Sequence, residues 1–327
     1  MHIPDGFVSG PMNVAGAVVA AATLAASTWR ASREAQDQPQ TVPLLATTGA
    51  FVFAAQMLNF PIGGGTSGHF LGAAAVTALL GPWRACLVMT LVVTLQALVF
   101  NDGGLTALGT NVCNMAVIGC FGSYVVMRML RVVFPPGRSG YLAATAIAGW
   151  GSVLIASAAC AVELALSGTS PLLLVLPAML GTHAVIGVGE ALITTALLSA
   201  VVASRPDIVP AWAAVGDSCD AARVKSPLWK VAGAGLFLAL ALAALASPLA
   251  SSFPDGLEKV AETAGFSSLA EDTPVWHNSP LPDYTVPGVE AEGVSTGLAG
   301  ILGTSAVFLL GFGVVKLLGR RGVKREN

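Results

Sequence analysis

Long apolar segments constrain this chain more than any other feature. A helix needs roughly 20 mainly apolar residues to cross a bilayer. Nine stretches approach that length, and they lie near residues 11–29, 42–60, 70–83, 85–100, 111–133, 141–166, 181–203, 229–249 and 294–317. Charged residues make up only 10% of the chain, against about 25% in soluble proteins. The sequence therefore predicts an all-α polytopic membrane protein with about nine transmembrane helices and no nucleic-acid partner.

The positions of Lys and Arg predict the orientation in the membrane, because cytoplasmic loops carry an excess of these residues. If all nine segments span and the amino terminus lies outside, 15 of the 16 basic residues are cytoplasmic and only Lys259 lies outside. The amino terminus is therefore predicted to be extracytoplasmic and the carboxyl terminus cytoplasmic. No cleaved signal peptide is expected, and a prokaryotic inner (plasma) membrane is the expected location.

Charge and hydropathy divide the chain into three parts. Residues 1–205 carry seven predicted spans, 206–228 form a polar cytoplasmic linker, and 229–327 carry two spans around an outside loop. That loop, 250–293, contains eight acidic residues and one basic residue. Its composition favours a loosely ordered, solvated segment. The five cysteines form no C-x-x-C pair, so no disulfide framework is predicted.

Polar groups are costly inside a membrane and usually mark function. Four polar stretches stand out, namely MHIPDG at the amino terminus, NFPIGGGTSGH at 59–69, NDGGLTALGTNVCN at 101–114 and GTHAVIGVGE at 181–190. The predicted orientation places one set of residues near the outside face, namely Met1, His2, His69, Asp102 and His183. A single membrane histidine is more often a packing residue than a ligand. Three histidines near one face leave a metal site and a packing role equally open.

The amino terminus offers three nitrogens in a row, which are the α-amine, the His2 amide and the His2 imidazole. Together they would close a five- and a six-membered chelate ring around one metal ion. A fourth nitrogen from a distant imidazole, such as that of His69, would complete a planar site that suits Ni²⁺ or Cu²⁺. The amine and the amide must lose protons, so binding is expected to weaken in acid. Met1 is expected to survive processing, because initiator methionine is generally removed only before small residues.

The glycine-rich stretch before His69 has two interpretations. The chain contains no G-x-x-x-x-G-K-[ST] motif, so this stretch is not a phosphate loop. It is either a simple helix break or a loop that folds back so that His69 reaches the amino terminus. Irregular backbone at that depth must be buried in protein or line a cavity. The short apolar segment 70–83 that follows is either a tilted span or part of a re-entrant element, and Glu190 is expected to pair with a buried polar group.

These stretches resemble one known family. MHIPDGF, NFPIGGGTSGH, QALVFNDGGLTALGTN and HAVIGVGEALIT look like the CbiM/NikM family, the substrate-binding membrane components of energy-coupling-factor (ECF) transporters for cobalt and nickel. The resemblance covers about residues 1–205. The carboxyl-terminal part resembles the small partner subunit CbiN/NikN, because FPDGLEKVAE at 253–262 looks like its P-D-G-L-E motif. Here the two are fused in one chain.

The resemblance implies a transporter component and not an enzyme. It implies that the Met1 amine, the His2 amide and imidazole, and the His69 imidazole hold Co²⁺ or Ni²⁺ as the transported ion, with no cofactor. It further implies a transmembrane coupling subunit (CbiQ/NikQ-like) and cytoplasmic ATPases (CbiO/NikO-like). MHIPDG in place of the MHIMEG of many cobalt members favours nickel, but some cobalt members also start this way, so the metal stays open. Side chains expected to support the ligands are Asp5, Asn59, Ser67, Asp102, Asn111 and His183.

Two other functions stay open at this point. GTSG at 65–68 matches the G-x-S-G of rhomboid-like intramembrane serine proteases, in which Ser67 and His183 would form a dyad. This four-residue match is weak, and it leaves the MHI start, NDGG and the acidic loop without a role. A passive channel would conduct metal without ATPase partners. Because no proposed ligand lies beyond His69, deletion of residues 206–327 is expected to leave the metal site intact.

Overall fold

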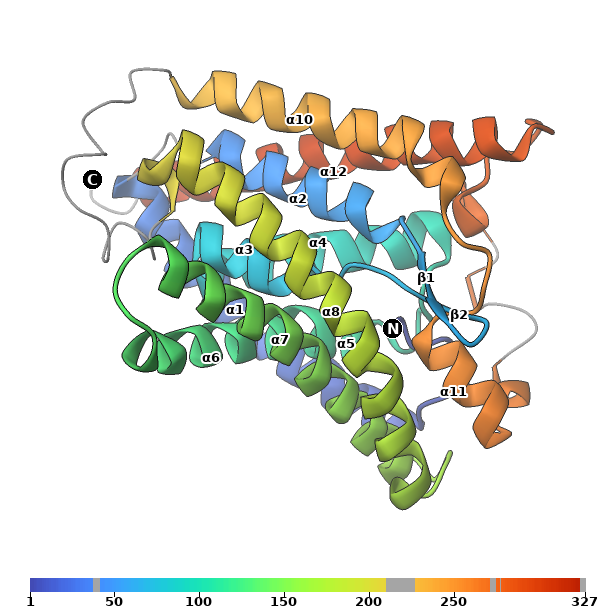
Figure 1. Ribbon diagram of the computed structural model, residues 1–327. Coiled ribbons are helices and arrows are strands. Elements are labelled where there is room, and N and C mark those ends of the chain that lie inside the picture. The colour runs from blue at the N-terminus through green and yellow to red at the C-terminus, as the bar shows by residue number, and fades with distance from the viewer. Residues whose placement is uncertain (38–41, 210–226, 271–274, 277, 324–327) are drawn as a thin grey trace.

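The structure is a computed structural model of the 327-residue chain, and it describes residues 1–37, 42–209, 227–270, 275–276 and 278–323. Long helices lie side by side in a bundle (Figure 1). The α-helices are α1 (Gly10–Asp37), α2 (Val42–Gln56), α3 (Ala73–Leu80), α4 (Pro82–Leu95), α5 (Leu108–Val112), α6 (Gly119–Val133), α7 (Arg138–Leu166), α8 (Leu172–Ser204), α10 (Leu228–Leu245), α11 (Gly256–Ala264) and α12 (Glu292–Val323). Most of the predicted linker 206–228, including Cys219, lies outside the described residues.

Within the described residues, seven helices are long and apolar enough to cross a membrane, rather than nine. They span residues 10–33, 82–100, 108–133, 138–166, 172–204, 228–249 and 292–314. The other two predicted spans correspond to shorter helices: α2 has 15 residues and α3 has eight. Gly81, with φ 76°, ends α3, and Pro82 begins α4 at once. A left-handed residue followed by proline is a strong helix boundary, and it shortens the predicted span.

The glycine-rich stretch forms a β-hairpin, so the chain is not entirely α-helical. Strands β1 (Phe60–Gly63) and β2 (Thr66–Gly68) pair antiparallel, with Phe60 opposite Gly68. The three turn glycines, 63 to 65, all have positive φ angles. Such angles cost glycine little, which explains why the sequence uses three of them here. The hairpin ends directly before His69 and thereby fixes where that residue lies (Figure 1).

The carboxyl-terminal helices pack against the amino-terminal part of the chain. Helix α2 contacts both α10 and α12. On one side, Ala50 and Ala54 of α2 lie against Ala239 and Ala243 of α10, and all four are completely buried. Small residues let membrane helices approach closely. The two predicted parts of the chain therefore share one packed interior.

The outer faces of the long helices are apolar. Exposed side chains include Leu173, which is 92% exposed, and Phe237, which is 75% exposed. A soluble protein rarely exposes contiguous apolar surface on this scale. These faces fit the lipid environment that the composition predicts.

The acidic loop 250–293 is more ordered than its composition suggests. It contains α11, whose amino end carries a complete capping box formed by Asp255 and Glu258. Leu257, Val260 and Ala261 are buried, and α11 packs against α8. The expectation of a solvated loop is therefore wrong for the described part. The apolar face of this short helix is what holds it to the core.

Candidate metal centre

The amino terminus lies inside the protein. Met1 is 6% exposed and Ile3 is completely buried. The Ile3 amide donates to Oδ1 of Asn111 at 2.8 Å, and its carbonyl accepts from Nδ2 of Asn111 at 3.0 Å and from the Gly104 amide at 2.8 Å. A Cβ on Gly104 would overlap the backbone of Asp5, so only glycine permits this approach. These contacts hold the first residues against the loop that follows α4.

Asp5 strengthens the same attachment. Its Oδ1 accepts from the Thr106 amide at 2.8 Å and from the Thr106 hydroxyl at 2.5 Å. The carboxylate is buried, so its hydrogen bonds are not exposed to competition from water. Asp5 and Asn111 thus hold the backbone of the amino-terminal segment in place.

His69 is positioned by buried Glu190 of α8. The Glu190 carboxylate accepts from the backbone amides of Leu71, at 2.7 Å, and Gly72, at 2.9 Å. This contact agrees with the expectation that Glu190 pairs with a buried polar group. His69 itself uses Nδ1 to contact the Phe70 carbonyl at 3.1 Å. If Nδ1 carries the proton for that bond, Nε2 is left with a free lone pair.

The free side of His69 faces the α-amine. The Met1 nitrogen lies 2.5 Å from Nε2 of His69, and the His2 and His69 rings stack with centroids 5.2 Å apart. Burial, followed by the charges of the amino terminus and of His2, lowers the pKa of His69 to about 3. The imidazole is therefore neutral at physiological pH, which is the form that binds a metal. The hairpin brings residues 68 positions apart in the sequence into direct contact.

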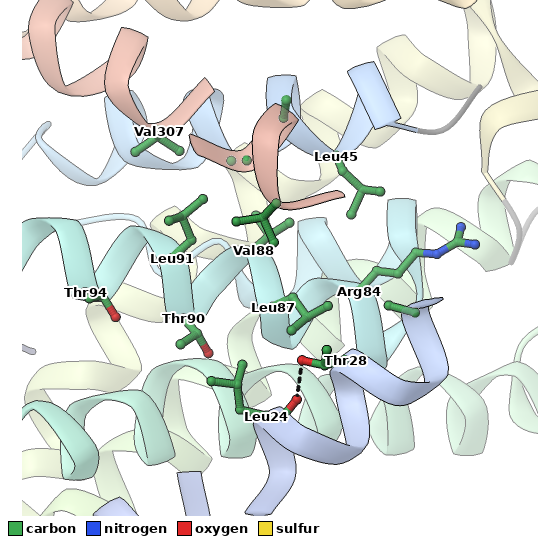
Figure 2. A pocket seen from close by; sticks show the side chains of 15 residues that line it. Leu24, Thr28, Leu45, Arg84, Leu87, Val88, Thr90, Leu91, Thr94 and Val307 are labelled. Carbon is green, nitrogen blue, oxygen red and sulfur yellow. Dashed lines mark hydrogen bonds between the residues drawn. The ribbon is translucent and has the colours of Figure 1, made fainter. Parts of the chain in front are cut away.

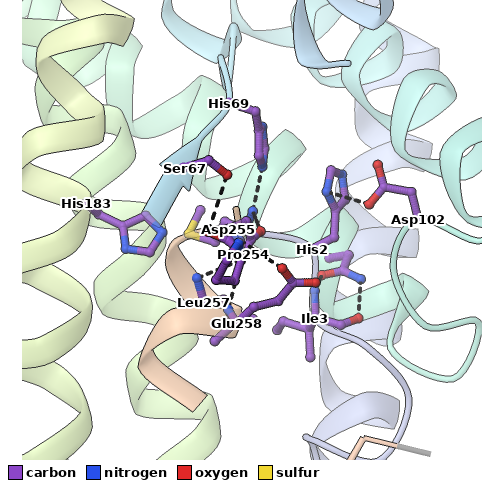
Figure 3. Close-up of polar contacts among 12 residues, drawn as sticks. His2, Ile3, Ser67, His69, Asp102, His183, Pro254, Asp255, Leu257 and Glu258 are labelled. Carbon is purple, nitrogen blue, oxygen red and sulfur yellow. Dashed lines mark hydrogen bonds and ion pairs between the residues drawn. The ribbon is translucent and has the colours of Figure 1, made fainter. Parts of the chain in front are cut away.

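The His2 ring is held by two polar side chains. Nδ1 lies 3.0 Å from Oδ1 of Asp102 (Figure 3). Nε2 lies 3.2 Å from Oε1 of Gln96. Burial alone would raise the pKa of Asp102, but His2 and Tyr284 hold it well below its usual range. Nδ1 has a single lone pair, so it can contact Asp102 or coordinate a metal but cannot do both. Oε1 of Gln96 is placed to accept a hydrogen bond from Nε2–H when Nδ1 is a ligand, as is typical around metal-bound histidines.

Asp255 of the acidic loop also contacts the amino terminus. Its Oδ2 lies 2.7 Å from the Met1 nitrogen, while its Oδ1 accepts from the amides of Leu257 and Glu258 (Figure 3). Burial alone would raise the pKa of Asp255, but the positive amine outweighs it and keeps the pKa low. From the sequence, no ligand is expected beyond His69 and no residue of the carboxyl-terminal part is expected at the site. The structure differs, because the carboxyl-terminal part reaches the amine directly.

Ser67 and His183 do not form a protease dyad. The Ser67 hydroxyl donates to the Phe253 carbonyl at 2.7 Å, and Nδ1 of His183 contacts the Met179 carbonyl at 2.8 Å. In Figure 3 a dashed line runs from Ser67 towards the segment at Pro254, and none joins Ser67 to His183. Ser67 fastens the hairpin to the acidic loop, and the Asn59 carbonyl does the same by accepting from the Ser251 amide at 2.7 Å. Ser67 through its hydroxyl and Asn59 through its backbone carbonyl thus contact the acidic loop.

Three residues of the site were not anticipated from the sequence, namely Gln96, Asp255 and Tyr284. Gln96 is completely buried inside the apolar run 85–100, and that polar exception was a usable signal. Asp255 lies in the P-D-G-L-E motif, but nothing in the sequence shows where the motif docks. The Tyr284 hydroxyl donates to Oδ2 of Asp102 at 2.5 Å, and no sequence pattern indicates this contact.

Among the described residues, no three His, Cys, Asp or Glu side chains are grouped so that they could hold a metal ion. A site at this position would therefore need donors from the backbone. The α-amine and the His2 amide are such donors, and the imidazoles of His2 and His69 would supply the rest. This is a nitrogen-rich set, which suits nickel or copper better than magnesium or calcium.

Two family models match the chain. Residues 2–208 match CbiM, the cobalt uptake substrate-specific transmembrane region, and residues 229–320 match the PDGLE domain. The chain belongs to the CbiM family. This CbiM-family protein is a multi-pass membrane component of cobalt/nickel transport and not an enzyme, so the protease alternative is rejected.

The CbiM-family chain also resembles proteins that carry both parts. A fused nickel transport protein NikMN from Rhodobacter capsulatus is 32% identical over 356 residues, covering 96% of each chain. A relative from Archaeoglobus fulgidus, provisionally named a fused nickel transport protein NikMN, is 36% identical over 97% of this chain and 98% of its own. A truncated transition metal transporter, solved as a crystal structure, is 33% identical with a TM-score of 0.54, covering 62% of this chain and 99% of that one.

Proposed function

We propose that this chain is the substrate-binding component of an ATP-driven ECF importer for Ni²⁺ or Co²⁺. The ion is held by the Met1 amine, the His2 amide and Nδ1, and Nε2 of His69. The observation that carries this proposal is the distance of 2.5 Å between the Met1 nitrogen and Nε2 of His69. With metal–nitrogen bonds of about 2 Å, adjacent donors in a square plane lie about 2.8 Å apart. The two nitrogens are therefore close to the spacing that one ion requires.

Binding of the ion would replace one of the contacts that the His2 ring already makes. The ion takes the Nδ1 lone pair of His2, so the contact between this ring and Asp102 is lost. Gln96 keeps its hydrogen bond with Nε2 and holds the ring in place. The α-amine and the His2 amide release protons, so affinity falls as the pH falls. Nickel is the favoured ion, because a planar four-nitrogen set suits it and the fused relatives are named nickel transport proteins.

The proposed topology follows from the charge distribution. The amino terminus and the metal site lie on the outer side, and the carboxyl terminus lies in the cytoplasm. The proposed division is 1–205 for the metal-binding part, 206–228 for the linker and 229–327 for the CbiN/NikN-like part. The partners are a CbiQ/NikQ-like coupling subunit and CbiO/NikO-like ATPases, since this chain has no phosphate-loop motif of its own.

Metal uptake with and without these partners tests the proposal. Cells that express this chain together with the coupling and ATPase subunits should accumulate radioactive nickel or cobalt against a gradient. Cells with the partners but with the His69→Ala chain should not, at equal membrane expression. ATP-driven uptake by this chain alone in vesicles would contradict the proposal, and ATP-independent flux of equal size would favour a passive channel instead.

A further inference from the structure

The fused carboxyl-terminal part contributes a charged side chain to the proposed site. Oδ2 of Asp255 lies 2.7 Å from the Met1 nitrogen, and the side chain of Asp255 is 15% exposed. The two residues are 254 positions apart in the sequence, so this contact depends entirely on how the acidic loop docks. Neither the family descriptions nor the names of the relatives assign a role to this residue.

Rigid neighbours fix the Asp255 carboxylate from both sides. On the carboxyl-terminal side, Oδ1 caps α11 through the amides of Leu257 and Glu258. On the amino-terminal side, the Pro254 carbonyl accepts from the Ser67 amide at 2.9 Å, which ties the loop to β2. Gly256 lies so close to His183 that a Cβ there would approach the ring to 2.9 Å. Backbone groups on both sides therefore hold the Asp255 carboxylate towards the amine, and no other side chain is needed to position it.

The chemistry allows Asp255 to keep this contact while the metal is bound. A coordinated primary amine gives its lone pair to the metal and still carries two N–H groups. One of them can donate to Oδ2, so Asp255 does not compete for the metal. A divalent ion held by one deprotonated amide and three neutral nitrogens has a net charge of +1. A buried charge needs an opposite partner, and Asp255 supplies one beside the amine.

We propose that Asp255 is a positioning residue for the metal site, so that the PDGLE segment completes the site that the amino terminus begins. This inference rests on the proposed function. Asp255 orients the Met1 amine towards His69 and offsets the charge of the bound ion, without being a ligand itself. Loss of such a supporting group around a metal ligand typically lowers affinity by about 10–100-fold.

The test compares Asp255→Asn with the unaltered full-length chain, purified in detergent without a histidine tag. Asparagine caps helices as well as aspartate does, so α11 should remain intact. Asp255→Ser, a second neutral capping residue, guards against a folding defect specific to asparagine. Glu262→Gln is the matched control, because Glu262 lies on the same helix and pairs only with Lys259 among the described residues. Nickel affinity is measured by chelator competition, and the donor set by the visible absorption of the bound ion.

We expect both Asp255 variants to bind Ni²⁺ about 10–100-fold more weakly than the unaltered chain, with unchanged visible absorption and thermal melting. Glu262→Gln should bind as the unaltered chain does. Unchanged affinity in the Asp255 variants would overturn the positioning role. A changed absorption band would overturn it too, because Asp255 would then be a ligand. An unaltered chain that binds no metal through nitrogen donors would instead contradict the proposed function.

Discussion

Two cavities in this molecule differ in what lines them, and the smaller one is the better candidate site. A cavity of about 300 Å³ lies between α1, α2, α4 and α12, and Leu24, Leu91 and Val307 are among its lining residues (Figure 2). A cavity of about 10 Å³ lies beside Met1, His69 and His183. Size and apolar walls are typical of a site for a small organic molecule, and of these two cavities only the first has both. A metal ion needs donor atoms rather than volume, and the second offers them.

Two hydroxyl groups that line the large cavity are engaged by their own helices. Thr28 donates to the Leu24 carbonyl and Thr90 to the Cys86 carbonyl, both at 2.7 Å. Such bonds within a helix leave a mainly apolar wall. In the small cavity, by contrast, the His69 imidazole and the α-amine face each other. Variants in the two regions should therefore differ sharply in their effect on metal binding.

The largest effect is expected from His69→Ala. This substitution removes one of four proposed nitrogens, so nickel affinity should fall by at least about 100-fold, which is the upper end of what losing a mere supporting group costs. Membrane insertion and melting temperature should change little, because His69 is buried beside polar groups and is not part of the apolar core. Elemental analysis of the purified variant measures the loss. A nickel content equal to that of the unaltered chain would remove His69 from the site.

An intermediate effect is expected from Glu190→Gln. Glutamine replaces one acceptor oxygen by an NH₂ group, which cannot accept from the amides of Leu71 and Gly72. The loop that carries His69 should lose part of its support, and nickel affinity should fall about 10-fold. Chelator competition measures the affinity, and visible absorption should show the same donors. If affinity does not change, the position of His69 does not depend on Glu190.

The smallest effect is expected from Val88→Ile in the large cavity. Val88 lines that cavity, so the added methyl group has space and should not strain the helices. Nickel affinity should stay within about twofold of the unaltered value, since overpacking costs arise only where space is lacking. The same chelator competition measures it. A loss as large as that of Glu190→Gln would mean that the large cavity takes part in metal binding.

The sequence could offer a contact between the amino terminus and His69 as one of two interpretations, and the structure brings the two together. It could do so because the chemistry of MHI and the isolated histidine after GGGTSG are both local signals. It could not predict that Asp255 reaches the same amine, because docking of α11 depends on a small apolar face formed by Leu257, Val260 and Ala261. The overall composition of the loop is acidic, and it does not reveal that three apolar residues share one face of a helix.

The span count failed for a similar reason. Hydropathy counted 70–83 as one segment, but the backbone turns at Gly81 and divides it. Asp102 was expected among the supporting side chains, but the polar stretch 101–114 does not show which ligand it faces, and the structure pairs it with His2. Short sequence motifs therefore allowed local features to be predicted, whereas contacts that depend on packing could not be predicted from the sequence.

The most direct test of the central claim asks whether the free α-amine is a ligand. Two chains are purified through a non-histidine tag after Asn327, one starting at Met1 and one with Gly-Ser-Gly-Ser before Met1. A longer extension is needed because a single added residue would place the histidine third and create a different chelate. Mass spectrometry confirms each amino terminus, and elemental analysis measures bound nickel at equal folding. The account predicts an equimolar amount in the first chain and almost none in the second; equal nickel content in both would contradict it.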